Sequence, residues 1–382
     1  MEAGKNPLGL YVHIPFCVQK CHYCDFLSFS CDIKIQEAYV DALCREIDGL
    51  FEKYALHHFV PTIYFGGGTP SLLSPESIKK ILGKLKSAFS VTADAEITLE
   101  ANPGTLSKEK LTAYRAMGIN RLSIGLQSAD AEELKLLGRI HTWELFRENF
   151  EAARREGFGN INVDVMTALP GQTKEKLLCT LEKVLALNPE HISAYSLILE
   201  EGTPFYETYG ADSGCPGLPD EEEERTLYYL TRDMLVKNGY FHYEISNFAK
   251  PGYESRHNSA YWTRQDYIGL GLGASSLLDN VRCRNQEDLP SYIENPCRTG
   301  ERFLLKKTAQ MEEFLFLGLR LLCGVDQYKF NKTFLVPLTE VYGGTLHRLM
   351  REGLLCEKDG CIALTDQGID YGNYVFSAFL LE

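Results

Sequence analysis

The sequence predicts an α/β protein in which an open or partial barrel of six strand–helix units precedes a mainly helical, winged-helix-like domain. Over residues 8–197, six strand-like runs alternate with helix-like segments, and such alternation builds a parallel sheet with right-handed crossovers. Six units are too few for the closed eight-unit barrel and too many for a small open sheet. From residue 307 onward the pattern turns helical, apart from a short two-stranded wing.

Local signals in the sequence support the individual elements. The predicted strands are residues 8–14, 61–65, 95–101, 121–125, 160–165 and 191–197, and the predicted helices are 33–54, one beginning at 74–76, then 108–117, 130–137, 143–156 and 173–187. Pro75 suits the first position of a helix, Ser107 is a favourable N-cap, and Gly118 suits a helix C-terminus. Ligands of such folds bind at the C-terminal ends of the strands, so we expect the functional site there.

The alternation ends near residue 200. The sequence predicts a Gly-, Pro- and acid-rich loop at 210–224 leading into a helix at 221–238, then helices at 311–322, 344–352 and 366–380, and a wing at 354–364. The Gly-x-Gly-x-Gly run at 269–273 is interpreted as a close-packing segment and not as a nucleotide loop, because it follows no strand–helix unit. We assign residues 1–205 to the partial barrel, 206–300 to a barrel-completing region and 301–382 to the helical, winged domain.

The bulk composition excludes several classes of function. The 382-residue chain carries a net charge of −13, which argues against a general nucleic-acid-binding surface, so the wing is interpreted as a packing or protein-contact element. No run of about 18 apolar residues occurs, and the N-terminus lacks the charged start and apolar core of a secretion signal. Cysteines without a paired pattern fit a reducing compartment. We therefore expect a cytoplasmic protein.

Three cysteines stand close together directly after the first predicted strand. Cys17, Cys21 and Cys24 form a Cys-x3-Cys-x2-Cys loop. Three thiolates would leave one iron of a four-iron cluster with an open position. Zinc usually takes four ligands in two separated pairs, disulfides are disfavoured in a reducing compartment, and 12 cysteines permit some clustering by chance. An iron–sulfur cluster is the interpretation that the spacing favours.

Other distinctive residues stand at the ends of the following strands. Residues 66–69 (Gly-Gly-Gly-Thr) follow the second strand, Glu100 and Asn102 end the third, Gln127 follows the fourth and Asp164 ends the fifth. In a parallel barrel these positions meet the cysteines at one face. A buried carboxylate can accept hydrogen bonds from hydroxyl or ammonium groups, and an arginine such as Arg139 can pair with a carboxylate ligand.

The cysteine loop, with Tyr23 inside it, and the GGGTP run at 66–70 resemble the signature of the radical S-adenosylmethionine (SAM) superfamily. The resemblance implies a radical SAM partial (β/α)6 barrel. It also implies a [4Fe–4S] cluster held by Cys17, Cys21 and Cys24, with SAM on the open iron. In that superfamily the reduced cluster supplies one electron that cleaves SAM to a 5′-deoxyadenosyl radical.

Further segments narrow this resemblance to one branch of the superfamily. YVHIPFC, LEANPGT, RLSIGLQS, LGRIHT, LPGQT, YEISNFA, SRHNSAYW and GLGLGAS resemble the oxygen-independent coproporphyrinogen III oxidase branch and, within it, the HemW family of haem chaperones. The C-terminal region is similar to the HemN-type domain of that branch. The resemblance implies that SAM is bound by residues matching the family motifs: Tyr11, Tyr23, Gly67, Gly68, Thr69, Glu100, Gln127, Arg139 and Asp164.

Two features depart from the oxidases of this branch, and a third departs from the family pattern. The oxidases carry a fourth cysteine two residues after the third, where this chain has Phe26, and they have a longer arm before the first strand. Both differences favour the chaperone family over porphyrinogen decarboxylation. Thr167-Ala168 stands where the family pattern leads us to expect Tyr-Gly.

The HNxxYW segment carries the haem interpretation. His257 offers an imidazole that can be an axial haem ligand, Tyr261 and Trp262 offer flat apolar surface, and Arg256 can pair with a propionate. The alternative is that His257 is a satisfied core histidine on a packed segment.

The resemblance therefore predicts a haem-binding, haem-delivering protein without coproporphyrinogen oxidase activity. Its expected partners are haem, haem-acceptor proteins such as respiratory enzymes, an electron donor and a second copy in a homodimer. Contact with a membrane would be at most peripheral, and no nucleic acid is expected. Two rival functions are an oxidative decarboxylase of coproporphyrinogen III and a related radical methyltransferase or haem-degrading enzyme.

Overall fold

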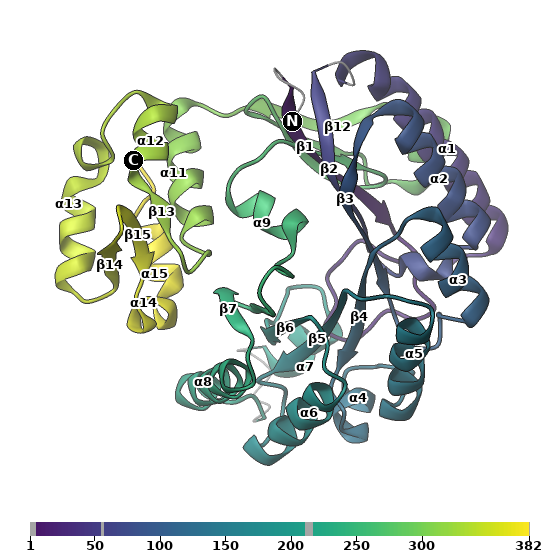
Figure 1. The fold of residues 1–382 in the computed structure, drawn as a ribbon, viewed down its shortest axis with the longest axis horizontal. Coiled ribbons are helices and arrows are strands. Elements are labelled where there is room, and N and C mark those ends of the chain that lie inside the picture. The colour runs from purple at the N-terminus through teal and green to yellow at the C-terminus, as the bar shows by residue number, and fades with distance from the viewer. Residues whose placement is uncertain (1–4, 55–56, 211–216, 382) are drawn as a thin grey trace.

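A computed structural model describes residues 5–54, 57–210 and 217–381, and its central feature is a strongly curved parallel sheet (Figure 1). The six strands are β1 (Asn6–Ile14), β2 (His58–Gly67), β3 (Ser90–Ala101), β4 (Arg121–Gln127), β5 (Ile161–Thr167) and β6 (His191–Ser196). They pair in sequence order, each parallel to the next. The predicted partial barrel of six parallel strands is confirmed.

Helices cover the outer surface of this sheet (Figure 1). They are α1 (Ile33–Tyr54), α2 (Pro75–Ala88), α3 (Lys108–Met117), α4 (Ala131–Leu136), α5 (Trp143–Arg155) and α6 (Lys174–Ala186), with a 3-10 turn, η1, at Pro70–Leu72. The predicted end signals act as expected. The Ser107 side chain accepts a hydrogen bond from the Lys110 backbone N–H, and Gly118 ends α3 with a φ of 94°.

Short strands extend the sheet at both edges, and the sequence did not predict them. β7 (Phe241–Glu244) and β8 (Asn247–Ala249) join beyond β6, while β9 (Tyr267–Leu270), β10 (Ser275–Leu278), β11 (Val281–Asn285) and β12 (Thr299–Leu304) join beyond β1. The helices of this region are α7 (Pro204–Tyr209), α8 (Glu221–Lys237), α9 (Arg256–Trp262) and α10 (Leu289–Glu294). Only α8 was predicted, since strands of three to six residues are too short to reveal a period. Part of the predicted acidic loop, 211–216, lies outside the described residues.

The C-terminal domain has a hydrophobic core of its own and stands beside the open side of the barrel (Figure 1). Its elements are α11 (Lys307–Gly318), β13 (Val325–Asp326), α12 (Gln327–Phe334), α13 (Leu338–Arg351), β14 (Leu355–Lys358), β15 (Cys361–Leu364), α14 (Asp366–Asp370) and α15 (Gly372–Ser377). The predicted wing is confirmed as the β14–β15 hairpin. The helix predicted at 311–322 begins and ends four residues earlier, the one predicted at 344–352 begins at Leu338, and α12 was missed.

The last predicted helix is divided in two at Tyr371. The barrel core runs from Leu8 to Tyr292 and the second core from Met311 to Phe379, while the division into three domains at 205 and 300 stays a prediction. Among the described residues, no helix combines the length and the apolar character needed to cross a bilayer.

Glu46 joins α1 to the strands that extend the barrel. Its fully buried carboxylate accepts hydrogen bonds from the Tyr292 hydroxyl (2.6 Å), the Gly271 backbone N–H (2.8 Å) and the Asn285 side-chain amide (2.7 Å). Burial raises the pKa of Glu46 from its ordinary value of 4.5 to about 7, although these hydrogen bonds oppose the shift.

We expect Glu46→Gln to flatten the pH dependence of stability between pH 4.5 and 7. In this window the folded protein keeps the Glu46 proton and the unfolded chain releases it, so the wild-type free energy of unfolding falls as pH rises. A shift of this size corresponds to about 3 kcal/mol. Urea unfolding of both proteins at pH 5 and pH 7.5 measures the difference. Equal pH dependence in the two proteins would show that Glu46 titrates normally.

Candidate functional site

The three predicted cluster cysteines follow β1 and face one cavity inside the barrel. Cys17, Cys21 and Cys24 are all free thiols, and all three line a cavity of about 350 Å³. No other cysteine lines it within the part of the chain that the structure describes. Burial raises the pKa of the Cys24 thiol, and the neighbouring Cys21 and Cys17 add to that shift. Three crowded sulfurs are a donor set that iron would stabilise as thiolates.

The three cysteines can be compared with the two alternative interpretations of the loop, a disulfide and a zinc site. The three thiols form no disulfide. Among the described residues, no three His, Cys, Asp or Glu side chains surround a point where one metal ion would fit, as zinc would require. A four-iron cluster takes each thiolate on a different iron, so three cysteines that line one cavity suit it.

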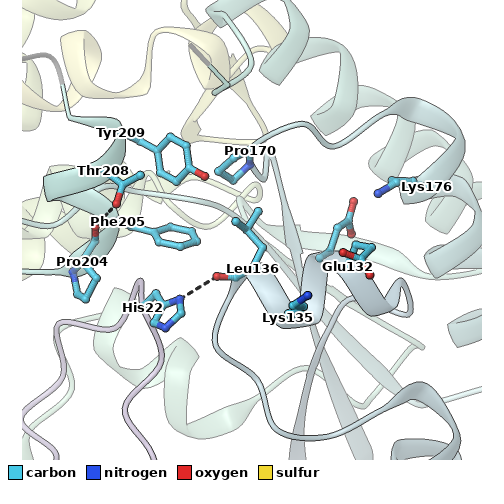
Figure 2. Close-up of a pocket in the computed structure, with 11 residues that line it drawn as sticks. His22, Glu132, Lys135, Leu136, Pro170, Lys176, Pro204, Phe205, Thr208 and Tyr209 are labelled. Carbon is cyan, nitrogen blue, oxygen red and sulfur yellow. Dashed lines mark hydrogen bonds between the residues drawn. The ribbon is translucent and has the colours of Figure 1, made fainter. Parts of the chain in front are cut away.

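The outer side of the cysteine loop is anchored to α4 and α7. His22, between two of the cysteines, directs Nδ1 at the Leu136 carbonyl oxygen (2.9 Å), and its backbone N–H donates to the Leu137 carbonyl (3.1 Å). Phe205 donates its backbone N–H to the His22 carbonyl (3.0 Å). These groups border a second, outward-facing cavity of about 630 Å³ (Figure 2). The loop is therefore fixed from outside while its sulfurs face inward.

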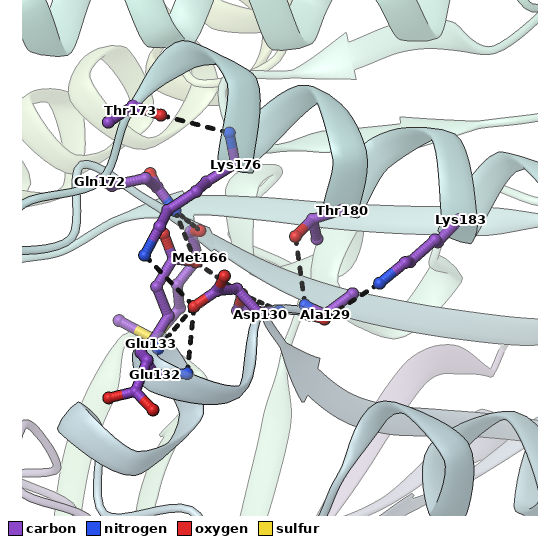
Figure 3. A network of polar contacts seen from close by, with 11 residues as sticks. Ala129, Asp130, Glu132, Glu133, Met166, Gln172, Thr173, Lys176, Thr180 and Lys183 are labelled. Carbon is purple, nitrogen blue, oxygen red and sulfur yellow. Dashed lines mark hydrogen bonds and ion pairs between the residues drawn. The ribbon is translucent and has the colours of Figure 1, made fainter.

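A polar network holds α4 against α6 (Figure 3). Asp130 caps α4 by accepting from the Glu133 backbone N–H (3.0 Å) and pairs with Lys176 of α6 (3.3 Å). The Glu133 carboxylate, buried at the start of α4, accepts from the Gln172 amide (3.3 Å). This network supports the segment that ends in Arg139, directly after α4.

Arg139 is held between two of the predicted site elements. One guanidinium nitrogen donates to the Asn102 side-chain oxygen (2.6 Å), and another lies 3.6 Å from the Cys21 sulfur. Asn102 in turn donates to the Thr69 hydroxyl (2.8 Å), which lies 3.6 Å from the Cys17 sulfur. These contacts fix the Arg139 guanidinium between the end of β3 and the cysteine loop.

Glu100 and Asp164 project into the cavity from neighbouring parts of the sheet. The Glu100 carboxylate accepts from the Tyr64 hydroxyl (2.7 Å) and the Gly67 backbone N–H (3.1 Å), and burial raises its pKa to about 7. The Asp164 carboxylate accepts from the Asn162 amide (2.7 Å), and burial raises its pKa as well. Such carboxylates can bind ribose hydroxyls or an ammonium group, as the SAM assignment requires.

Two further features of the cavity indicate a ligand. Arg121, only 1% exposed, lines it, and its Nε finds no hydrogen-bond partner among the described residues. Gln127 lines it with a φ of 70°, a conformation that costs a non-glycine residue energy and that clusters at functional sites. A bound carboxylate would satisfy the buried guanidinium, so the residues present fit SAM.

The cavity contains most of the predicted SAM residues. Tyr23, Gly67, Gly68, Glu100, Gln127, Arg139 and Asp164 line it with the three cysteines. Thr69 lies behind Cys17 and borders a smaller pocket, and Tyr11 faces a neighbouring cavity. Their roles in SAM binding stay predictions.

Sequence reasoning missed several residues that line the cavity. Among the missed residues are Tyr64, Arg121, Ser123, Asn162 and Ser193. A signal was available for three of them, because side chains two positions apart in a strand share a face. Tyr64 is two positions before Gly66, Ser123 four before Gln127 and Asn162 two before Asp164.

The loop after β5 contains a strained alanine. Ala168 has a φ of 57°, a region that glycine enters readily and that costs an L-residue about 1–2 kcal/mol. The glycine expected from the family pattern would adopt this backbone conformation readily. Ala168 adopts the same conformation although it carries a Cβ.

We expect Gly68→Ala to weaken SAM binding by disturbing the cysteine loop. A Cβ at residue 68 would lie 2.7 Å from the Phe16 carbonyl oxygen and 3.0 Å from the Cys17 sulfur. Relieving such overlap costs about 1–3 kcal/mol, or roughly a 5- to 150-fold loss of affinity if the cavity bears it. Calorimetry with SAM on the cluster-containing protein measures this. Gly83→Ala on α2 is the control, since nothing lies within 4 Å of that Cβ. Equal SAM affinity in both variants would contradict the expectation.

A third cavity adjoins the first and is lined by α9. It has a volume of about 470 Å³ and is bordered by Tyr261 and Trp262 of α9, by Arg282 and Arg284 of β11, and by Leu317 of α11. α9 lies between the curved sheet and the C-terminal domain (Figure 1). Phe26 is 60% exposed and lines both this cavity and the cysteine cavity.

His257 is buried beneath this third cavity. Its Nδ1 lies 2.9 Å from the Thr62 hydroxyl and its Nε2 lies 2.8 Å from the Tyr261 hydroxyl, while its ring stacks on Tyr64. Burial lowers the pKa of His257 to about 3, so the imidazole is neutral. The role of His257 as an iron ligand stays a prediction that requires one of these hydrogen bonds to be released.

Arg256 faces away from the third cavity. Its guanidinium donates to the Asp94 carbonyl oxygen (2.8 Å), and it does not border the cavity. The role of Arg256 as a propionate partner stays a prediction. The arginines that border the cavity are Arg282 and Arg284 of β11.

The fold and the three-cysteine cavity define a radical SAM protein. The Radical SAM superfamily model matches residues 11–184, and the HemN C-terminal domain model matches residues 305–371. Membership of this class implies a [4Fe–4S] cluster and SAM, and the cavity described above fits both.

Full-length comparisons narrow the class. The chain is 42% identical to the heme chaperone HemW of Escherichia coli, with 98% of this chain and 99% of that protein covered. It is 38% identical to the heme chaperone HemW of Lactococcus lactis, with coverage of 99% and 98%. The chain belongs to the HemW family. Among solved structures, it resembles the E. coli coproporphyrinogen III oxidase HemN, with a TM-score of 0.85 and 25% identity over 99% of this chain and 91% of that one.

Proposed function

We propose that this protein is a haem chaperone that binds haem and delivers it to acceptor proteins, respiratory enzymes among them. The observation that carries the proposal is the cavity between α9, β11 and α11. It combines aromatic faces at Tyr261 and Trp262 with the cationic side chains of Arg282 and Arg284. Its volume of about 470 Å³ lies within the usual range of ligand pockets, about 300–1,000 Å³.

The cavity offers groups that suit both the flat macrocycle of haem and its anionic propionates. A macrocycle would stack on aromatic rings, and its propionates would pair with arginines. Arg284 is about half exposed and Arg282 is partly buried against Glu313. Trp262 adds an indole N–H that is buried and finds no acceptor among the described residues. These groups support haem as the ligand.

Phe26 supports a chaperone over an oxidase. The oxidases of this branch carry a cysteine at this position, and here a large apolar side chain borders both cavities. It is therefore placed to touch a haem on one side and the cluster region on the other. We propose that the cluster and SAM regulate haem transfer or dimerisation without turnover of a porphyrin.

The remaining partners follow from this function. They are an electron donor for the cluster, the haem acceptors and a second copy of the chain, with contact to a membrane at most peripheral. The net charge of −13 disfavours nucleic acid, and we expect a cytoplasmic location.

Oxidative decarboxylation of coproporphyrinogen III is the second candidate function. The likeness to the HemN structure favours it. Its substrate would occupy the same barrel opening, and Phe26 is the residue that argues against it.

One experiment separates the two functions. The protein, purified anaerobically with a reconstituted cluster, is titrated with haem and, separately, incubated with coproporphyrinogen III, SAM and a reductant. The chaperone proposal predicts saturable haem binding, lost or weakened in His257→Ala and retained in His347→Ala, whose exposed histidine lies on α13. Conversion of coproporphyrinogen III to protoporphyrinogen IX would contradict the chaperone proposal, and so would the absence of saturable haem binding. SAM cleavage by itself favours neither function.

A further inference from the structure

We propose that His191 is a positioning residue of the SAM site, because it orients the Asn162 amide and through it the carboxylate of Asp164. The inference rests on the function proposed above only in that SAM is bound at this site through Asp164. Asn162 and Asp164 border the cysteine cavity, whereas His191, on the neighbouring strand β6, does not border it and is 0% exposed. His191 can therefore act on a ligand only through its neighbours.

The Asp164 carboxylate is held on both of its oxygens. The Asn162 side-chain amide donates to Oδ1 (2.7 Å), and the Ser123 hydroxyl donates to Oδ2 (3.3 Å). The same amide nitrogen also donates to the Ser123 oxygen (2.7 Å), which leaves the serine proton for Asp164. The direction in which Asp164 presents its carboxylate to the cavity therefore depends on the amide of Asn162.

His191 decides which end of the Asn162 amide faces Asp164. Its Nδ1 lies 2.6 Å from the Asn162 side-chain oxygen, and the Ser193 hydroxyl donates to the same oxygen (3.1 Å). An amide donates only through its nitrogen and accepts only through its oxygen, whereas a serine hydroxyl can do either. A rotated amide would set its N–H groups against the Nδ1–H of His191 and its oxygen against the Asp164 carboxylate. The histidine thus selects the orientation that supports Asp164.

The tautomer of His191 is set from the other end of its ring by a backbone N–H. Nε2 lies 2.8 Å from the Tyr243 hydroxyl, which accepts from the Ser255 backbone N–H (3.2 Å). Among the described residues the Tyr243 hydroxyl has no other acceptor, so its buried proton is satisfied only by donating to Nε2. Burial lowers the pKa of His191 well below its ordinary value. The ring is therefore neutral, and its one proton stands on Nδ1.

This chain of hydrogen bonds begins at the N-terminus of α9. Ser255 is the N-cap residue of that helix, and its hydroxyl accepts from the Asn258 backbone N–H (3.3 Å). Asn258 itself borders the cysteine cavity. The start of α9 thus reaches the SAM site at two points, directly through Asn258 and indirectly through His191.

The test is calorimetric titration of the full-length, cluster-containing protein with SAM. His191→Leu removes the donor to Asn162 and should weaken SAM binding about 10-fold, the loss expected for one hydrogen bond. His191→Asn has the same branched shape as leucine but offers an amide N–H near the position of Nδ1, so it should restore part of the affinity. Tyr243→Phe releases the tautomer and should cause a smaller loss. Tyr240→Phe is its matched control, because that buried hydroxyl donates to the Pro189 carbonyl oxygen (2.6 Å), outside the chain.

A double-mutant cycle with Asp164→Asn separates positioning from a general structural effect. If His191 acts through Asp164, the loss caused by His191→Leu should shrink to less than about twofold in the Asp164→Asn background, because no carboxylate is left to orient. Circular dichroism and iron content establish that each variant is folded and holds its cluster. If His191→Leu does not fold, Tyr243→Phe takes its place in the cycle.

Two results would overturn the positioning role. One is an equal loss of SAM affinity in both backgrounds, and the other is wild-type affinity in the folded His191→Leu protein. An Asp164→Asn protein with wild-type SAM affinity would also overturn it, since Asp164 would then not bind the ligand. A wild type that binds SAM but no haem would instead overturn the proposed function and leave this inference standing.

Discussion

Replacing Cys21 with alanine is expected to abolish the iron–sulfur cluster. Cys21 is one of the three predicted cluster ligands, its sulfur lies 3.6 Å from a guanidinium nitrogen of Arg139, and among the described residues no fourth cysteine borders the cavity to replace it. Two remaining thiolates cannot hold a cubane that already has one open iron. After anaerobic reconstitution, iron should fall from about four per chain to near zero, together with the cluster absorbance and the SAM affinity.

The matched control is Cys179→Ala, which removes an exposed free cysteine on the outer helix α6. It should keep full iron content and full SAM affinity. Both proteins should retain their secondary structure, because Cys21 lies on a loop whose outer side is anchored through His22. A Cys21→Ala protein that still incorporates a normal cluster would refute the assignment of the three ligands.

Replacing Glu313 with alanine is expected to cost about 3–5 kcal/mol of folding free energy. Glu313 of α11 pairs with Arg264 (2.9 Å) and with Arg282 of β11 (2.7 Å), and its side chain is only 10% exposed. It thereby ties the C-terminal domain to the barrel. Alanine would leave two largely buried guanidinium groups without their counter-charge, which is the costly way to break a buried ion pair.

Denaturant unfolding monitored by circular dichroism measures this loss. Glu313→Gln keeps one accepting oxygen at the site and should cost less than alanine. Glu301→Ala on the exposed strand β12 should stay within about 0.5 kcal/mol of wild type. If Glu313→Ala lost no more unfolding free energy than Glu301→Ala, other contacts would have to join the C-terminal domain to the barrel.

The two cavities inside the barrel explain how one fold can serve a carrier and an enzyme. The cysteine cavity holds the groups that we expect to bind a cluster and SAM, and the α9 cavity holds aromatic and cationic groups suited to haem. Phe26 borders both. A movement of the cluster loop would therefore displace Phe26 in the α9 cavity as well. We propose that the cluster could regulate haem release through this side chain.

Local patterns in the sequence determined the parallel barrel, the wing and most of the cysteine cavity. Strand–helix alternation is a short-range property, and the C-terminal ends of parallel strands must meet at one face. Glu100, Gln127 and Asp164 could therefore be assigned to the same site as Cys17 and Cys21 before any coordinates, and the structure places them around one cavity.

Only the tertiary structure decided which side chains face which cavity. The sequence marked His257, Tyr261 and Trp262 as haem residues, and the structure buries His257 against Thr62 and Tyr64 while Tyr261 and Trp262 line the cavity. Arg121 became a site residue only when β4 placed it, largely buried, beside the carboxylates. The physical reason is that burial and hydrogen-bond partners depend on contacts between residues far apart in the chain. Thr62 and His257 are 195 positions apart, and no local period records such a contact.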